Sequence, residues 1–195
     1  MTLTKLANSA AVALILLGSA STFAADNALY DTPPPDDAAF VRWVGLGSQH
    51  PVFGIAPATH IADVYRPVSA AATNGAQPGT YYTAAAGPDG RVLLIEEPGR
   101  EDRSKVHLFL VNLGSSPVRV AVTDQDMVVI DDTATGAAAS RAVNPVSANL
   151  SLVTANGQTL ASFDVTLRRG QNLTFVAHDD TARLIENSFG PNIDG

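Results

Sequence analysis

The chain has 195 residues, no cysteine and a formal net charge of −7, with 46% apolar and 16% charged residues. This length accommodates one large or two small domains, and the composition is typical of a folded protein, not of a charged disordered chain. A surface for nucleic acid needs clustered lysine and arginine, so the acidic balance excludes nucleic acid as a partner. The lack of cysteine excludes disulfides, thiolate metal sites and a cysteine nucleophile.

Residues 1–24 have the pattern of a secretory signal peptide. Lys5 supplies a positive charge, the run 10–17 is apolar, and Thr22-Phe23-Ala24 offers small residues at a cleavage site. The apolar core is shorter than the roughly 20 residues that cross a bilayer. We therefore predict cleavage after Ala24, export to the periplasm and no membrane insertion of the product.

The second half of the chain shows the two-residue alternation of β-strands. Four runs alternate apolar and polar residues in this way: 118–122, 146–152, 160–167 and 173–177. Asn156-Gly157, between two of these runs, is the dipeptide best suited to a tight hairpin turn. The run 106–111 is apolar throughout, as in a central strand covered on both faces. We predict an antiparallel β-sandwich here.

The first half contains five candidate short strands: 40–44, 52–55, 64–69, 81–85 and 91–95. Most of the chain's 12 prolines also lie in this half. The polar, charged segment Pro98–Ser104 indicates a boundary. We predict an all-β chain with a small β-sandwich domain at 25–98, a linker at 99–104 and a second β-sandwich domain at 105–195. The alternative is one continuous sandwich of about 11 strands.

Catalytic and metal-binding patterns are absent from the sequence. The four histidines, His50, His60, His107 and His178, lack the i, i+4 spacing of a helical metal site. No Gly-x-Ser-x-Gly serine elbow occurs. We therefore expect no catalytic residue, no cofactor and no metal ion, and a protein that is not an enzyme. A Ser-His-Asp triad assembled only in space is the alternative.

An acidic cluster raises the question of calcium, which prefers oxygen ligands. Asp124, Asp126, Asp131 and Asp132 lie within nine residues, but the strand-like run 127–130 interrupts them. The segment also lacks the Asp-x-Asp-x-Asp-Gly order with a distal glutamate. We expect solvated carboxylates in turns, with a calcium loop as the alternative.

Aromatic residues gather in the first half of the chain: Tyr30, Trp43, Tyr65, Tyr81 and Tyr82. Sugar rings stack on exposed aromatic faces. Because successive side chains of a strand point to opposite faces, at least one of Tyr81 and Tyr82 belongs to the core. We expect ordinary packing of these aromatic residues, with a sugar-stacking platform as the alternative.

A series of short motifs, in order along nearly the whole chain, resembles the AlgF family of alginate O-acetylation accessory proteins. The motifs are Ala28-Leu29-Tyr30, Ala39-Phe40-Val41-Arg42, Tyr81-Tyr82-Thr83, Glu96-Glu97-Pro98, Val111-Asn112-Leu113, Arg141-Ala142-Val143-Asn144-Pro145-Val146 and Arg169-Gly170. Their order and spacing behind a signal peptide make the combination more specific than any one motif.

The resemblance implies a periplasmic, non-catalytic protein with two β-sandwich domains joined by a short linker. It also implies acetyltransferase partners, namely a membrane-bound O-acyltransferase and periplasmic acetyltransferases. Together these proteins acetylate mannuronate hydroxyls in a secreted acidic polysaccharide. The expected function is therefore an adaptor for O-acetylation of alginate or a similar exopolysaccharide. A carbohydrate-binding module that holds the acceptor polysaccharide is the alternative.

Four polar residues at the ends of elements are the candidate partner-binding residues: Glu96, Glu97, Arg141 and Asn144. Glu96 and Glu97 close a predicted strand beside the linker, and Asn144 precedes a proline at a turn. A protein with a net charge of −7 repels an acidic polymer over a Debye length of about 8–10 Å. The charge therefore favours protein partners over direct contact with the polysaccharide.

Overall fold

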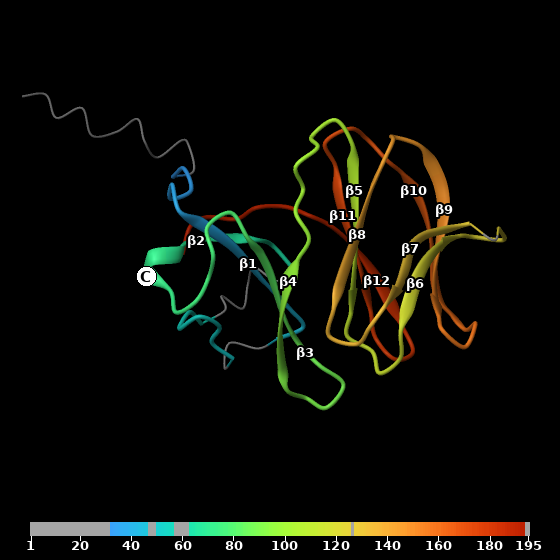
Figure 1. Cartoon of the computed structure of the whole chain (residues 1–195), viewed down its shortest axis with the longest axis horizontal. Helices are drawn as coiled ribbons and strands as arrows, with labels where there is room; N and C mark the ends of the chain where they lie inside the picture. Colours follow the sequence, from blue (N-terminus) through green and yellow to red (C-terminus); the bar gives the residue numbers. More distant parts are fainter. Residues whose placement is uncertain (1–31, 47–49, 57–62, 126, 194–195) are drawn as a thin grey trace, which may run out of the picture. The chain divides into compact units, whose positions relative to one another are not determined.

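The structure is a computed structural model that describes residues 32–46, 50–56, 63–125 and 127–193. The predicted signal peptide, Tyr30 and His60 lie outside these residues. The described strands are β1 (Ala38–Val44), β2 (Arg66–Ser69), β3 (Tyr81–Ala86), β4 (Val92–Glu97), β5 (Val106–Asn112), β6 (Val118–Val122), β7 (Val128–Thr133), β8 (Ala138–Val143), β9 (Ser147–Thr154), β10 (Thr159–Thr166), β11 (Asn172–Ala177) and β12 (Ala182–Glu186). A single 3₁₀ turn at Ala70–Ala72 follows β2 in the described part of the chain (Figure 1).

The strands form three four-stranded sheets. Sheet 1 has the order β2-β1-β3-β4, sheet 2 the order β12-β11-β5-β8, and sheet 3 the order β10-β9-β6-β7. Sheets 2 and 3 pack face to face, as the strand ribbons in Figure 1 show, around a core of Val, Leu, Ile and Phe. The predicted all-β, sandwich-like fold class is therefore confirmed. The sheets are not antiparallel throughout, although the sequence predicted an antiparallel sandwich: the strand pairs β1–β3 and β5–β11 are parallel, and the other strand pairs are antiparallel.

Strand β5 lies in the middle of the structure, and all seven of its residues are buried. Leu108 and Leu110 belong to the core between sheets 2 and 3. Val111, on the opposite side of β5, packs with residues of sheet 1. The prediction of a central strand covered on both faces is confirmed.

Sheet 1 covers the outer face of sheet 2. Val44, Ala85 and Ile95 of sheet 1 form one apolar cluster with Val176 and Ile185 of sheet 2. The opposite face of sheet 1 carries Val41, Trp43 and Tyr82, which are buried under Val52 and Ala76 of the connecting segments. Because both faces of β1 are covered, its residues are apolar nearly throughout, without alternation of apolar and polar side chains.

The end of the chain returns to sheet 1 after β12. Phe189 forms a bridge with Tyr65, and Ile193 forms a bridge with Val68 of β2. The side-chain amide of Asn192 also donates a hydrogen bond to the carbonyl of Pro33. The residues from Thr32 onward form one compact unit, and the boundaries at 98 and 105 stay predictions.

The predicted hairpin is confirmed, since β9 and β10 pair antiparallel and Gly157 in their turn has a φ of 87°. Residues 52–55, predicted as a strand, form a tight turn instead, because Phe53 and Gly54 both have positive φ. Strands β8 and β12 were not predicted from the sequence. The described ranges contain no helix with the length and apolarity needed to span a membrane.

The turn glycine provides a direct test of the hairpin. A Cβ at Gly157 would meet no atom within 4 Å, so Gly157→Ala changes only the backbone preference. We expect this variant to lose about 1–2 kcal/mol of unfolding free energy, since a left-handed conformation disfavours alanine. Gly157→Asn should recover part of the loss, because asparagine tolerates positive φ. Urea unfolding measures both variants, and equal stability of the alanine variant and the original protein would contradict this reading of the turn.

Candidate functional site

The carboxylate of Glu97, at the end of β4, lies in the interior where sheet 1 faces sheet 2. Its side chain has 0% exposed surface. Arg42 Nη2 donates to Oε1 at 2.9 Å, and Arg100 Nη2 donates to Oε2 at 2.8 Å. The Tyr65 hydroxyl lies 2.7 and 2.6 Å from the two carboxylate oxygens, and the Thr83 hydroxyl donates to Oε1 at 2.5 Å. We call these five residues the Glu97 network.

Arg42 joins this network to sheet 2 and to the end of the chain. Its Nη2 donates to Thr174 Oγ1 of β11 at 3.1 Å, and its Nη1 donates to Asn187 Oδ1 at 3.0 Å. Its Nε donates to Thr83 Oγ1 at 2.7 Å. One guanidinium therefore connects β1, β3, β4, β11 and the segment after β12.

Arg100, from the linker, is held mainly by aromatic rings. Its guanidinium carbon lies 3.7 Å from the ring centroid of Tyr81, 4.4 Å from that of Phe109 and 4.6 Å from that of Tyr65. Cation–π attraction of this kind is strongest where water is excluded, and the Arg100 side chain is only 4% exposed. Nε and Nη1 of Arg100 have no hydrogen-bond partner among the described residues.

Burial raises the pKa of Tyr65 well above its ordinary value, and the negative charge of Glu97 raises it further. The phenol therefore stays neutral and acts as a donor to Glu97. Two guanidinium cations then share one carboxylate, so the Glu97 network carries a net charge of +1.

The structure does not bring the four predicted partner-binding residues together. Glu97 is enclosed in its network, whereas Glu96 is exposed on the opposite face of β4. Arg141 is exposed on β8, the edge strand of sheet 2. Asn144 follows β8 and accepts a hydrogen bond from Lys105 Nζ at 2.6 Å. Their role in partner contacts stays a prediction.

Sequence reasoning did not identify Arg42, Tyr65 or Arg100 as partners of Glu97. A signal was present, because Arg42 stands in the otherwise apolar strand β1, and a buried arginine needs an acidic partner. The identity of that partner depends on packing between sheets, which the sequence pattern does not specify.

The residues considered for metal binding or catalysis are dispersed. His107 is buried, and its Nε2 lies 2.9 Å from the carbonyl oxygen of Asp102. Asp131 and Asp132 are exposed on β7, and Asp126 lies outside the described residues. In the described ranges, no group of three histidine or acidic side chains has the geometry to hold a metal ion.

The aromatic residues mostly serve packing. Trp43, Tyr65 and Tyr82 are buried, in agreement with the expectation of ordinary packing. Tyr81 is half-buried and stacks on Phe40 with ring centroids 4.7 Å apart. Phe189 lies beside this pair and is 52% exposed.

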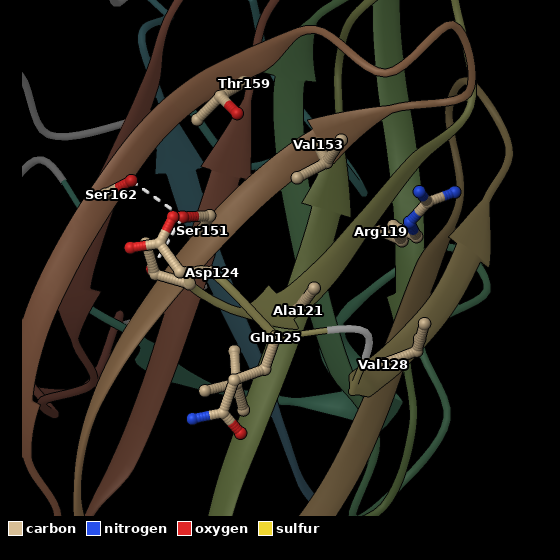
Figure 2. Close-up of a pocket in the computed structure, with 11 residues that line it drawn as sticks. Arg119, Ala121, Asp124, Gln125, Val128, Ser151, Val153, Thr159 and Ser162 are labelled. Atoms are coloured by element: carbon tan, nitrogen blue, oxygen red, sulfur yellow. Dashed lines mark hydrogen bonds between the residues drawn. The ribbon is translucent and has the colours of Figure 1, made fainter.

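A groove of about 530 Å³ runs along the outer face of sheet 3. Figure 2 shows Ser151, Ser162 and Asp124 together on one side and Arg119 on the other. The Ser151 hydroxyl lies 2.7 Å from that of Ser162 and 2.7 Å from that of Thr123. These hydroxyls satisfy one another, and the groove holds no buried charged group.

Comparison with known protein families shows which family this chain belongs to. The model described as "Alginate O-acetyl transferase AlgF" matches residues 11–174. The chain belongs to the AlgF family.

Two curated AlgF proteins illustrate the relationship. The alginate biosynthesis protein AlgF of Pseudomonas aeruginosa is 28% identical over 163 residues, which cover 75% of either chain. The alginate biosynthesis protein AlgF of Azotobacter vinelandii is 27% identical over 178 residues, covering 80% of this chain and 81% of the relative. A solved structure of the C-terminal domain of AlgF from P. aeruginosa matches with 22% identity and a TM-score of 0.38, covering 43% of this chain and 96% of that domain.

The AlgF match includes all five residues of the Glu97 network. Arg42, Glu97 and Arg100 lie within the matched residues 11–174, whereas Asn187 and the rest of the returning segment lie beyond them. The network therefore lies in the part of the chain that matches the family. The hydrogen bond from Arg42 to Asn187 connects it to a segment outside that match.

Removing the Tyr65 hydroxyl tests the network. Tyr65→Phe leaves the Glu97 carboxylate buried with one donor fewer, so we expect a loss of about 1.5–3 kcal/mol of unfolding free energy. Tyr82→Phe is the matched control, since the Tyr82 hydroxyl accepts one bond, from the backbone N–H of Gln77 at 3.1 Å. It should lose about 0.5–1.5 kcal/mol. Denaturant unfolding compares the two, and a smaller loss for Tyr65→Phe than for Tyr82→Phe would refute a central role of Tyr65.

Alkaline pH should weaken the fold through the same phenol. Above the ordinary tyrosine pKa of 10.0, the unfolded chain releases the Tyr65 proton while the folded protein keeps it. The folded state then holds more protons, so its stability falls as pH rises beyond that value. In Tyr65→Phe the unfolding free energy should fall less steeply with rising pH, by up to about 1.4 kcal/mol per pH unit. Unfolding measured at a series of alkaline pH values checks this, and identical slopes in the two proteins would count against it.

Proposed function

We propose that this chain is a periplasmic, non-catalytic adaptor for the O-acetylation of alginate or a similar exopolysaccharide. In this role it docks a membrane O-acyltransferase and periplasmic acetyltransferases. The family is described by alginate O-acetyl transfer, which supports alginate as the polysaccharide and O-acetylation as the reaction. The signal-peptide pattern of residues 1–24 supports export to the periplasm.

The observation that carries the docking role is the outer face of strand β4. Val92 and Leu94 point to this face with Glu96, and they are 37% and 44% exposed. The segments that cover Trp43 and Tyr82 on the same side of sheet 1 leave β4 uncovered. Two neighbouring exposed apolar side chains on an edge strand are typical of a surface that binds another protein.

Glu96 is the polar member of this surface, since it points to the same face of β4 as Val92 and Leu94. Arg141 stands on the neighbouring edge strand β8, but its side chain points to the sheet 3 side of sheet 2, as its register partner Leu108 does. Arg141 is therefore not part of this surface. We expect a partner segment with apolar side chains for Val92 and Leu94 and a polar group for Glu96. We call Val92, Leu94 and Glu96 the β4 face.

Co-purification tests the adaptor. A tagged protein expressed in cells that acetylate their exopolysaccharide should capture the acetyltransferase proteins from a periplasmic and membrane extract. Leu94→Asp should reduce this capture by about tenfold or more, because a buried charge without a partner costs more than 1.4 kcal/mol. Polymer acetylation, measured by the acetyl content of the secreted polysaccharide, should fall in parallel.

Val146→Asp is the matched control, since Val146 is 53% exposed and stands outside the β4 face, just before β9. It should leave both capture and acetylation unchanged. Failure of the original protein to capture any acetyltransferase would defeat the adaptor. An acetyl group transferred covalently to a serine or histidine of this chain from an acetyl donor would show that it is an enzyme instead.

A further inference from the structure

Strand β4 forms one edge of sheet 1, with β3 as its neighbour on the other side. At the start of the β3–β4 ladder, the Gly87 N–H donates to the Arg91 carbonyl oxygen at 2.8 Å, so these two residues form a hydrogen-bonded pair. Bonded and non-bonded pairs alternate along an antiparallel ladder. The register therefore makes Leu93 and Ile95 the residues of β4 whose backbone groups bond to β3.

The residues of the β4 face, Val92, Leu94 and Glu96, alternate with these bonded positions. Their backbone N–H and C=O groups consequently point away from β3, toward the open edge. Among the described residues, none outside β3 is hydrogen-bonded to the backbone of these three. Pro98, which has no N–H, ends the row. The same residues thus offer exposed side chains and unpaired backbone groups.

The other edge strands are protected in ways that β4 is not. The returning segment covers β2, where Ile193 forms a bridge with Val68. Strand β7 carries the exposed carboxylates of Asp131 and Asp132. On the described edge strands β8, β10 and β12, no large apolar side chain is exposed. An apolar edge without such protection is a template for pairing with another chain.

We propose that β4 binds its partner by strand addition, in which an extended segment of a partner acetyltransferase protein pairs with β4 as a further strand of sheet 1. Backbone hydrogen bonds to Val92, Leu94 and Glu96 hold the segment, and every second side chain of the segment lies beside the β4 face. The inference deepens the proposed function and rests on it, because that function supplies the partner.

The β4 face specifies the side chains of the added strand. Directly opposed residues on one face of a ladder lie about 4.5–5.5 Å apart, so Val92 and Leu94 favour apolar side chains opposite them. Glu96 is exposed and forms no ion pair among the described residues. A lysine or arginine opposite Glu96 supplies the complementary charge. The added strand therefore carries apolar residues and one basic residue at alternate positions.

A second copy of this chain fits the edge less well. Its own β4 face offers Val92, Leu94 and Glu96, without a cation. An antiparallel pairing of all three residues sets each Glu96 opposite Val92, which takes a carboxylate out of water without a partner. A parallel pairing sets Glu96 opposite its own copy, and like charges repel there. The nearby cation Arg91 is five positions from Glu96 and so belongs to the opposite face of the ladder.

Removal of one backbone N–H separates strand addition from contact through side chains alone. Val92→Pro removes an outward N–H and keeps an apolar side chain of similar size, and proline is tolerated at edge positions of this kind. Val92→Ala is the matched control, since it shortens the side chain and keeps the N–H. The probe is the acetyltransferase protein purified with the tagged chain. Val92→Pro should raise its Kd by about thirtyfold or more, and Val92→Ala by about fivefold or less.

Unfolding curves check that both variants fold, and amide hydrogen exchange of the original protein reads the same pairing without a substitution. In the free protein, the N–H groups of Leu93 and Ile95 should exchange slowly and those of Val92 and Leu94 quickly. With the acetyltransferase protein bound, exchange at Val92 and Leu94 should slow by about tenfold or more. Unchanged fast exchange at these two residues in the complex, or equal Kd values for Val92→Pro and Val92→Ala, would overturn the proposal.

The outcomes separate this inference from the proposed function. Tight capture of the acetyltransferase protein by both variants would reject strand addition and retain the adaptor. No capture by the original protein would reject the adaptor and, with it, the acetyltransferase as the source of the added strand. Sedimentation at increasing concentration tests the second copy: a dimer that Val92→Pro dissociates would overturn the assignment of the partner.

Discussion

The packing of this fold depends on one buried carboxylate, that of Glu97. A buried ion costs several kcal/mol unless other groups surround it with opposite charge and hydrogen bonds. Those groups come from Arg42 in β1, Thr83 in β3, Tyr65 before β2 and Arg100 in the linker. Arg42 also donates to Thr174 Oγ1 of β11, so the network ties the register of sheet 1 to sheet 2 and favours one packing of the two sheets among the many that apolar contact alone would allow. Apolar clusters hold the sheets together, and the network specifies how they meet.

The parts of this architecture that depend on local periodicity were accessible from the sequence. The alternating runs around Asn156-Gly157 predicted the β9–β10 hairpin, and the apolar run at 106–111 predicted the buried strand β5. Strand β8 was missed because its sequence, Ala-Ala-Ser-Arg-Ala-Val, has small and polar residues where an edge strand faces water. The candidate site was only partly accessible: Glu97 was singled out, but as a contact for a partner protein. Arg100 lies only three positions from Glu97, but the other neighbours of Glu97 lie 14 to 55 positions away in the chain, and no pattern in a single sequence joins them.

Net charge proved a poor guide to the local surface. The value of −7 describes the field that a distant polymer meets, and screening by salt limits that field to about 8–10 Å. At shorter range the charge of individual side chains dominates, and Arg100, Arg103 and Lys105 lie together around one cavity. The charged segment 99–104, which marks a boundary in the sequence, supplies Arg100 to the Glu97 network once folded.

The segment after β12 affects the order in which the molecule can be assembled. Asn187 is 145 positions from the Arg42 side chain that it binds, and Ile193 reaches back to Val68. During synthesis the amino-terminal end of a chain emerges first, so β1, β2 and β3 are complete before the residues after β12 can reach them. Long-range closure of this kind is slow, because the loss of chain entropy precedes the gain from contact. During that interval the apolar faces of sheet 1 are exposed to water, and a chaperone that shields them until the last residues arrive would raise the yield of folded protein.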